Sequence, residues 1–317
     1  MRVSVIVPLY NKANYIERCL QSILGQSFQD FEILVVDDGS TDGGVEIVQR
    51  CGDPRLRLLS QPNAGPGAAR NMGANQARGD LIAPLDADDV WEAEYLRESV
   101  RWLDGYGEDV ACLSWGMWEH PPGTSTEGRW KRLGIPEGVF RMEPGTPVRL
   151  LVALAAHMLP SSTVVRREVY RQLGGFYEKN RCRYSEDAYL WLKILCRHPV
   201  ALHARPMVHK YEDAAQLSRN LPGVRPIEPF LLEPEGLMEG CPPELKPLLR
   251  AFLAARACKT ASVYGYWGQW REARRLVRRF VRPQDWRQPY FITALAGSTP
   301  LGGWAGRLAR GAAGRHG

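Results

Sequence analysis

The sequence lacks the cysteine spacings that mark a metal knuckle or a disulfide-rich scaffold. Its seven cysteines, spread over 317 residues, include no CxxC pair. We therefore expect neither a zinc knuckle nor a dense set of disulfides, and a reducing cytosol is the simplest environment for these thiols. The marks of a disordered chain are also missing, because 44% of the residues are hydrophobic and 24% are charged. The chain is long enough for one large domain or two modest ones.

Long apolar runs are scarce as well. Residues 150–165 lack charge but are few and include His157 and Pro160, while residues 288–306 lack charge but carry two prolines and four glycines. A membrane-spanning helix needs ~20 predominantly apolar residues, so we expect none. The first residues lead directly into a strand pattern, and we expect no secretory signal. The expected location is cytoplasmic, with peripheral attachment at the inner face of the cytoplasmic membrane as an open alternative.

Two common nucleotide-binding motifs are absent. No GxGxxG follows the first apolar run, and no GxxxxGK[ST] occurs anywhere in the sequence. This argues against a Rossmann cofactor site and against a P-loop. The run Gly65-Pro66-Gly67 is a weak hint of a phosphate loop, and a helix entry with proline near its start explains it equally well.

Positive charge is concentrated near the C-terminal end. The net charge is +6, but residues 267–317 hold ten arginines and two acidic residues, which leaves −2 for residues 1–266. A nucleic-acid-binding core would carry its own basic face, so we expect no nucleic acid partner. The basic tail favours peripheral contact with an anionic membrane, and an ordinary solvated helix face is the alternative.

One helical stripe in this tail is the surface expected to meet lipid. Trp270, Ala273, Val277 and Phe280 recur at helical spacing, with arginines on both sides. Such a helix can lie in a lipid interface. Packing of the stripe against the rest of the protein is the alternative.

The first 90 residues alternate strand patterns with helical patterns. Strands are predicted at residues 3–7, 31–36, 56–59 and 81–85. Helices are predicted at residues 16–24, 45–48 and 68–77, the first capped by Asn14 and the second by Thr41 or Asp42. This alternation predicts an α/β fold with a Rossmann-like, mostly parallel sheet and helices on both faces.

The second half is less regular. Extended segments are predicted at residues 109–115, 163–165 and 199–209, and helices at residues 148–157 and 186–196. Residues 119–147 are rich in proline and glycine and predict a long loop. Residues 243–281 predict a pair of helices that turns near Gly265–Gly268.

Acidic residues follow two of the predicted strands. Asp37 and Asp38 follow the second strand, and Asp86, Asp88 and Asp89 follow the fourth. Ligands of open α/β sheets bind beyond the carboxyl ends of the strands. Carboxylates gathered there repel one another unless they bind a cation or accept hydrogen bonds, and hard oxygen ligands suit Mg²⁺ or Mn²⁺. Turn formation and helix capping are the alternative, mainly for Asp37.

Four segments together resemble glycosyltransferase family 2. The family's opening block is similar to VSVIVPLYNKANYIERCLQSILGQSFQDFEILVVDDGSTD, and its next block, which ends in the DxD motif, to NAGPGAARNMGANQARGDLIAPLDADD. Its acceptor-side segment with the ED motif resembles LPSSTVVRREVYRQLGGF and YSEDAYLWLKIL. The resemblance extends over residues 3–220 and implies a GT-A fold, a nucleotide-sugar donor, a divalent metal and inversion at the anomeric carbon.

The resemblance assigns residues to the nucleotide side of such a site. Pro8, Tyr10 and Asp38 match positions that line the pocket for the base and ribose. Asp38 would accept a hydrogen bond from the N–H of a uracil-like base, which favours a UDP-sugar. Arg70 matches a basic position near the nucleotide.

The resemblance to glycosyltransferase family 2 also assigns residues to metal binding and to catalysis. Asp86 would contact the ribose and a metal-bound water, and Asp88 would bind Mn²⁺ or Mg²⁺ directly, with Asp89 as the substitute ligand. Asp187 matches the general base, and Glu186 precedes it in a supporting role. Capping of the helix at 186–196 is the alternative for this pair.

Histidine marks a departure from the family pattern. Many relatives carry a histidine shortly before a QLS triplet, whereas here the run is YEDAAQLSR and His209 lies seven residues before Gln216. The resemblance therefore assigns no third metal ligand. A strand or surface position is the favoured interpretation for His203 and His209.

The implied organisation has a GT-A domain over residues 1–220 and a helical, basic C-terminal extension over residues 221–317. Residues 1–115 would form the nucleotide-sugar half and residues 116–220 the acceptor half. The implied function is metal-dependent, inverting transfer of a sugar to a hydroxyl of a glycan or lipid-linked acceptor in cell-surface polysaccharide synthesis. A nucleotidyltransferase, which should show a basic glycine-rich loop near the first strand, and a non-catalytic nucleotide-sugar binding module are the alternatives.

Overall fold

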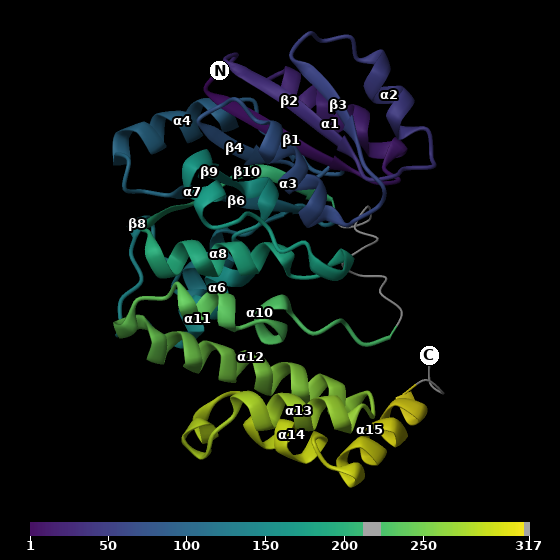
Figure 1. Ribbon diagram of the computed structural model, residues 1–317, viewed down its shortest axis with the longest axis vertical. Helices are drawn as coiled ribbons and strands as arrows, with labels where there is room; N and C mark the ends of the chain where they lie inside the picture. The colour runs from purple at the N-terminus through teal and green to yellow at the C-terminus, as the bar shows by residue number, and fades with distance from the viewer. Residues whose placement is uncertain (212–222, 314–317) are drawn as a thin grey trace. The chain divides into compact units, whose positions relative to one another are not determined.

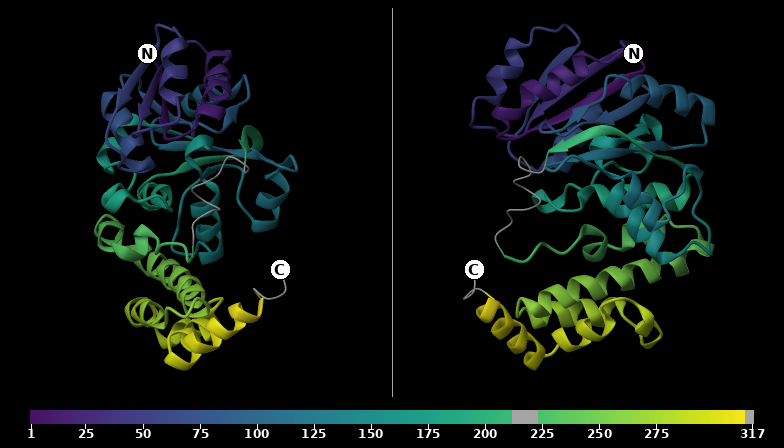
Figure 2. Two further views of the ribbon diagram at one scale, coloured as in Figure 1. Left: turned by 90° about the vertical axis from the view of Figure 1, so that its right-hand side faces the viewer. Right: turned by 180° about the vertical axis from the view of Figure 1, so that it is seen from behind.

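The computed structural model describes residues 1–211 and 223–313, without the side chains of residues 307–313 (Figures 1 and 2). The chain divides into two compact units. The first unit combines residues 1–142 with 153–220, and the second combines residues 143–152 with 221–317. Each unit has its own secondary structure.

The first unit is built on one large mixed sheet with the strand order β3-β2-β1-β4-β9-β6-β10-β5, while β7 pairs with β6 and β8 with β10. The strands are β1 (Val3–Leu9), β2 (Phe31–Asp37), β3 (Leu56–Ser60), β4 (Leu81–Pro84), β5 (Val90–Trp91), β6 (Cys112–His120), β7 (Thr124–Ser125), β8 (Gly138–Phe140), β9 (Thr163–Arg166) and β10 (Val200–Tyr211). Strands β3, β2, β1 and β4 run parallel, and β9 enters antiparallel between β4 and β6. The four strands predicted in the first half are therefore confirmed.

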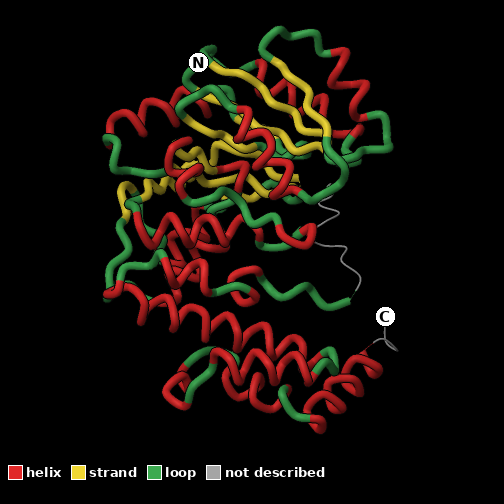
Figure 3. The backbone as a smooth tube through the Cα atoms, in the orientation of Figure 1, coloured by secondary structure: helices red, strands yellow, loops and turns green. Residues whose placement is uncertain are grey.

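Helices flank this sheet, as the tube in Figure 3 shows in red beside yellow strands. They are α1 (Ala13–Leu24), α2 (Gly44–Arg50), α3 (Pro66–Gln76), α4 (Tyr95–Tyr106), α5 (Glu127–Leu133), α7 (Arg167–Gln172) and α8 (Glu186–Arg197), with α6 (Val148–His157) shared between the segments of the two units. Strands β1, β2 and β4 are almost completely buried, and their apolar side chains belong to the core on the two faces of the sheet. This burial explains their continuous apolar sequence.

The predicted cap of the first helix is wrong. Helix α1 begins at Ala13, so Asn14 lies inside it. The carboxylate of Asp42 instead accepts the Ala13 N–H at 2.8 Å and the Gly44 N–H at 3.1 Å. One aspartate thus satisfies free N–H groups at the start of both α1 and α2, which local spacing could not reveal.

The predicted loop at residues 119–147 is also wrong in part. It contains β7, α5 and β8. Helix α5 is anchored by Trp130, whose side chain is buried, and the Thr126 hydroxyl before it accepts the Met117 N–H at 2.9 Å. A single buried tryptophan holds this short helix, so no long apolar period marks it in the sequence.

The second unit is helical in the residues described. Its elements are α10 (Pro229–Leu232), α11 (Glu235–Glu239), α12 (Lys246–Tyr266), α13 (Trp270–Phe280), α14 (Phe291–Gly297) and α15 (Pro300–Ala313). The predicted helical pair at 243–281 is confirmed as α12 and α13, which are joined by residues 267–269. In the described part of the chain, no helix has the length and apolarity needed to cross a bilayer.

The apolar stripe of α13 packs in part inside this unit. Ala273 and Leu276 are buried, and the Trp270 side chain lies against Gly303 of α15. Of the four stripe residues, Ala273 is buried and Trp270, Val277 and Phe280 are half-buried, so packing accounts for part of the stripe and its contact with lipid stays a prediction. The arginines of α13 remain on its outer surface.

Candidate functional site

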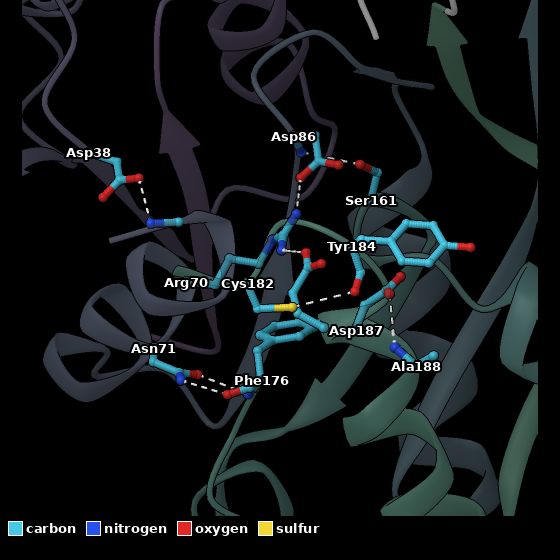
Figure 4. A network of polar contacts seen from close by, with 12 residues as sticks. Asp38, Arg70, Asn71, Asp86, Ser161, Phe176, Cys182, Tyr184, Asp187 and Ala188 are labelled. Atoms are coloured by element: carbon cyan, nitrogen blue, oxygen red, sulfur yellow. Dashed lines mark hydrogen bonds and ion pairs between the residues drawn. The ribbon is translucent and has the colours of Figure 1, made fainter. Parts of the chain in front are cut away.

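Arg70 connects the two acidic motifs of the sequence. It lies on α3, and its Nη2 donates to Asp86 Oδ1 at 2.5 Å while its Nη1 donates to Glu186 Oε1 at 2.9 Å (Figure 4). Asp86 follows the carboxyl end of β4, and Glu186 is the first residue of α8. One guanidinium therefore joins the carboxyl end of a central strand to a helix that begins 100 residues later in the chain. Burial opposes the charge of Arg70, but Asp86 and Glu186 raise its pKa, so it stays positive.

Close packing of α3 makes this bridge possible. Gly65 precedes the helix with φ +97°, a conformation that favours glycine, and Pro66 is its first residue. A Cβ at Gly67 would lie 2.4 Å from the Tyr177 carbonyl oxygen and 3.3 Å from Glu186 Cγ. The start of α3 therefore touches the segment that leads into α8. The run Gly65-Pro66-Gly67 is a helix entry whose glycines allow close approach.

Asp187 lies directly beside this bridge at the start of α8. Its side chain is half-buried, and its Oδ1 accepts the Ala188 N–H at 2.8 Å (Figure 4). Burial, followed by the negative charge of Glu186, raises the pKa of Asp187 to about 7, and Arg70 acts in the opposite direction. A carboxylate with a pKa near neutrality can accept a proton from a hydroxyl group and release it again.

The acidic residues after β4 have different partners. Asp88 forms an ion pair with Lys12 at 2.7 Å, whereas Asp89 is buried and accepts a hydrogen bond from Ser161 Oγ at 2.6 Å. Ser161 Oγ also accepts the Asp86 N–H at 3.1 Å. Burial, and then the charge of Asp86, raises the pKa of Asp88, while Lys12 lowers it. Asp88 is thus the carboxylate directed to a cation, and Asp89 is held by a hydroxyl.

These carboxylates fit a divalent ion that binds together with a phosphate ligand. The Asp86 and Asp88 oxygens are hard donors, and their mutual repulsion would be relieved by a cation. In the residues described, no group of three His, Cys, Asp or Glu side chains could hold a metal by itself. Mg²⁺ is usually bound by one or two protein carboxylates, and water and substrate phosphates complete its coordination shell. Metal binding by Asp89 stays a prediction that would require Ser161 to release it.

Asp38 organises the loop that leads into α3. Its carboxylate accepts hydrogen bonds from Gln61 Nε2 at 2.8 Å, from the Ala64 N–H at 2.7 Å and from the Gly65 N–H at 2.9 Å. An ionised carboxylate offers about four acceptor positions, and these bonds occupy three of them on a side chain that is itself buried. Contact with a base stays a prediction for this residue.

Pro8 and Tyr10 lie beside Asp38 at the edge of the sheet. Pro8 is opposite Val36 in the β1–β2 register, and the Asp38 N–H donates to the Leu9 carbonyl at 2.8 Å. The Tyr10 ring is half-buried and lies 5.7 Å from the Arg183 guanidinium. The structure therefore brings together the three positions expected to line a base pocket, although their contact with a nucleotide stays a prediction.

His203 and His209 both lie on β10, in agreement with the predicted strand or surface position. His203 is buried, with Nε2 3.1 Å from the Tyr106 hydroxyl and Nδ1 3.1 Å from Glu137 Oε1. His209 lies between His120, at 3.0 Å, and Glu92, at 2.8 Å. The QLS triplet at 216–218 lies outside the described residues, so its relation to His209 stays open.

Lys12 and Ser161 are site residues that sequence reasoning missed. Lys12 follows β1 at the edge of the sheet where the acidic residues gather, and a search of strand ends for basic as well as acidic residues would have found it. Ser161 lies in the 3₁₀ turn Pro160–Ser162, and its position between Asp86 and Asp89 has no counterpart in any local pattern.

Comparisons with known proteins agree with this arrangement. The sequence model of glycosyl transferase family 2 matches residues 4–174, more than half of the chain. The glycosyltransferase GlyA of Streptococcus pneumoniae is 40% identical over 112 residues, which is 35% of this chain and 16% of GlyA. The chondroitin synthase of Pasteurella multocida is 42% identical over 94 residues, or 29% of this chain and 10% of that enzyme. The chain thus spans a small part of these curated relatives.

A solved structure resembles the fold over most of the chain. The structure of S. aureus TarS residues 1–349 in complex with UDP-GlcNAc superposes with a TM-score of 0.65, covering 93% of this chain and 80% of that one at 22% identity. The expected GT-A fold, an α/β sheet flanked by helices, is therefore confirmed. The chain belongs to glycosyltransferase family 2.

Proposed function

We propose that this member of glycosyltransferase family 2 transfers a sugar from a nucleotide-diphosphate donor to a hydroxyl of a glycan or lipid-linked acceptor, with inversion at the anomeric carbon. The observation that supports this most is the Arg70 bridge, which places the acidic edge of the sheet beside Asp187. Donor binding is assigned to residues 1–115 and acceptor approach to residues 116–220. Residues 221–317 form an extension outside the catalytic machinery.

A UDP-sugar is the favoured donor. The TarS structure that shares this fold holds UDP-GlcNAc. In this chain Asp38 matches a family position that lines the base pocket, where its carboxylate would accept a hydrogen bond from the N–H of a uracil base. The similarity to a chondroitin synthase supports a role in polysaccharide synthesis and a sugar hydroxyl as the acceptor.

Positive charge at the edge of the sheet would stabilise the leaving group. The departing nucleoside diphosphate gains negative charge as the glycosidic bond breaks, and groups fixed in advance near that charge lower the barrier. Lys12 and Arg70 already lie among the acidic residues there, at 2.7 Å from Asp88 and 2.5 Å from Asp86 respectively. Asp86 and Asp88 would hold Mn²⁺ or Mg²⁺, which when bound neutralises diphosphate charge.

Asp187 would act as the general base. A sugar hydroxyl is a weak nucleophile, so its proton must leave as the oxygen attacks the anomeric carbon. The ionised Asp187 carboxylate takes that proton, the new glycosidic bond forms on the face opposite the leaving group, and inversion follows. Glu186 accepts a hydrogen bond from Arg70, and burial followed by the negative charge of Glu186 raises the pKa of Asp187 to about 7, where proton transfer is efficient.

A donor screen tests the proposal. The purified chain would be incubated with UDP-GlcNAc, UDP-glucose and GDP-mannose, with and without Mn²⁺, and the released nucleoside diphosphate would be measured. We expect metal-dependent release of UDP from at least one UDP-sugar, faster when an oligosaccharide acceptor is added. Calorimetric donor binding without release or transfer for every donor and acceptor would instead indicate a non-catalytic binding module. Release of pyrophosphate would indicate a nucleotidyltransferase.

A further inference from the structure

Helices α14 and α15 present large apolar side chains to the surface. Residues 288–306 contain no charged side chain and form most of these two helices. Ile292 on α14 and Leu301 on α15 are each 79% exposed, and Trp304, one turn after Leu301, is 56% exposed. Leu295, one turn after Ile292, is also exposed. Each helix therefore has an outward apolar face of two large side chains.

The inward faces of the same helices are made of small residues. Gly297 of α14 packs against Gly265 of α12 so closely that a Cβ at Gly265 would lie 2.3 Å from the Gly297 Cα. Gly303 of α15 lies against the Trp270 side chain, and Ala294 is completely buried. This pattern is the reverse of an ordinary amphipathic helix, which turns its large apolar side chains inward. The outward face therefore needs an apolar partner of its own.

Aromatic rings and arginines border this face. Trp286 and Tyr290, which precede α14, are 61% and 54% exposed. Arg282 and Arg287 are exposed before them, and Arg307 and Arg310 follow the uncharged run in the sequence. Helix α13 of the same unit adds an open arginine groove of about 410 Å³, lined by Trp270, Arg271, Arg274, Arg275, Arg278 and Arg279. Amphipathic aromatic rings and arginines are typical of protein surfaces at the headgroup level of a bilayer.

We propose that the outward face of α14 and α15, together with Trp286 and Tyr290, inserts into the interface of an anionic lipid bilayer. The two helices have 7 and 14 residues, so they suit a position in the plane of the membrane. The surrounding arginines would pair with lipid phosphates. A second copy of the chain fits less well, because its own arginine-rich border would meet the same charge. The α13 stripe is not part of the proposed face, because Ala273 is buried and the Trp270 side chain lies against Gly303.

Vesicle co-sedimentation tests this proposal without any turnover, so its outcome is separate from that of the proposed function. The full chain would be mixed with vesicles of phosphatidylcholine alone or with 30% phosphatidylglycerol. We expect binding to the anionic vesicles that weakens at high salt. The triple change Ile292→Ser, Leu301→Ser and Trp304→Ser should lower the bound fraction at least ~10-fold.

A matched variant controls for apolar loss elsewhere. Leu133, Val139 and Leu232 are also exposed, and changing all three to serine should leave binding within about twofold. Brominated phospholipid should quench the tryptophan fluorescence of the unaltered chain, a result that needs no variant to fold. Absence of quenching, or equal binding by the triple variant, would overturn the proposal. Sedimentation as a dimer that the triple change dissociates, without vesicle binding, would assign the face to a second copy.

Discussion

At the scale of single residues, the candidate site depends on the charges of Arg70, Glu186 and Asp187, which lie close together. Arg70 is nearly inaccessible and remains charged because Asp86 and Glu186 both contact it. Asp187 forms no ion pair of this kind, and its Oδ1 accepts only the Ala188 N–H among the hydrogen bonds described. Burial, and then the negative charge of Glu186, raises the pKa of Asp187 to about 7, although Arg70 acts in the opposite direction.

This arrangement predicts the pH dependence of transfer. The proton acceptor must be ionised, and the pKa of Asp187 is raised to about 7, so kcat/KM should rise as pH increases through about 7 and level off above it. Glu186 raises that pKa by its negative charge, so Glu186→Gln should shift the midpoint to lower pH. Initial rates of UDP release between pH 5 and 9 would show both effects.

A distant acid provides the control for this shift. Glu168 of α7 is exposed and accepts a hydrogen bond from Gln172. Glu168→Gln should therefore leave the midpoint of the pH–rate profile unchanged. A midpoint near pH 4, or one that Glu186→Gln does not move, would show that Asp187 does not limit the rate.

The ends of β4 predict where metal acts. Asp88 follows the carboxyl end of the strand, so Asp88→Ala should remove the Mn²⁺ enhancement of donor affinity while the fold persists. Asp80 precedes the amino end of the same strand and pairs with Arg2 on the surface, so Asp80→Ala should leave that enhancement intact. Calorimetry of UDP binding with Mn²⁺ and with chelator measures both. Equal metal enhancement in Asp88→Ala and the unaltered chain would contradict this assignment.

At the scale of secondary-structure elements, the Arg70–Glu186 contact depends on the short distance between α3 and the segment before α8. Gly67 allows it, because any Cβ there would collide with the Tyr177 carbonyl oxygen. Gly67→Ala should therefore lower the free energy of unfolding by about 1–3 kcal/mol through overpacking. It should also weaken donor binding, since Arg70 would lose its alignment with Glu186.

A second helical glycine supplies the comparison. Gly105 of α4 is exposed and has open space where a Cβ would be, so Gly105→Ala should raise the free energy of unfolding by about 0.5–1 kcal/mol. Urea denaturation of both variants measures the difference. If Gly67→Ala were as stable as the unaltered chain, close packing of α3 would not support the site.

Elements with strong periodicity were predictable, and elements held by single contacts were not. Strands β1, β2 and β4 are nearly continuous apolar runs, and helix α13 repeats apolar residues between arginines at helical spacing over its 11 residues. Helix α5 depends on one buried tryptophan within a segment rich in proline and glycine, and the start of α1 depends on Asp42, 29 residues away. Such contacts arise from tertiary packing, which spacing along the chain does not encode.

The candidate site was predictable in its acidic residues and in Arg70, but Lys12 and the pairs that these charged residues form were not. The positions of Asp86, Asp88, Glu186 and Asp187 followed from strand ends and from the family resemblance. The Lys12–Asp88 pair joins residues 76 apart and the Arg70–Glu186 bond residues 116 apart, so neither is visible as a local motif.

At the scale of the whole molecule, the candidate site and the proposed lipid-binding face lie in different parts of the chain. Strands, acidic residues and the Arg70 bridge lie in the first unit, whereas the arginine-rich helices and the exposed apolar face lie in the second. The sequence showed the excess of arginine in the tail and the apolar stripe of α13, but it did not show the exposed apolar face of α14 and α15. The reversed faces of α14 and α15 became evident once glycine contacts showed which side of each helix was inside.

In the proposed mechanism, residues from distant parts of one chain perform donor binding and proton removal, and Asp187→Asn separates these two roles. The donor Kd by calorimetry and the rate of sugar transfer would be measured on the same preparation, with Glu186→Gln as the neighbouring comparison. We predict a donor Kd within about twofold of the unaltered chain and transfer slower by at least ~100-fold, the low end of a general-base contribution, with a smaller loss for Glu186→Gln. Undiminished transfer by Asp187→Asn with donor binding intact would show that Asp187 is not the general base.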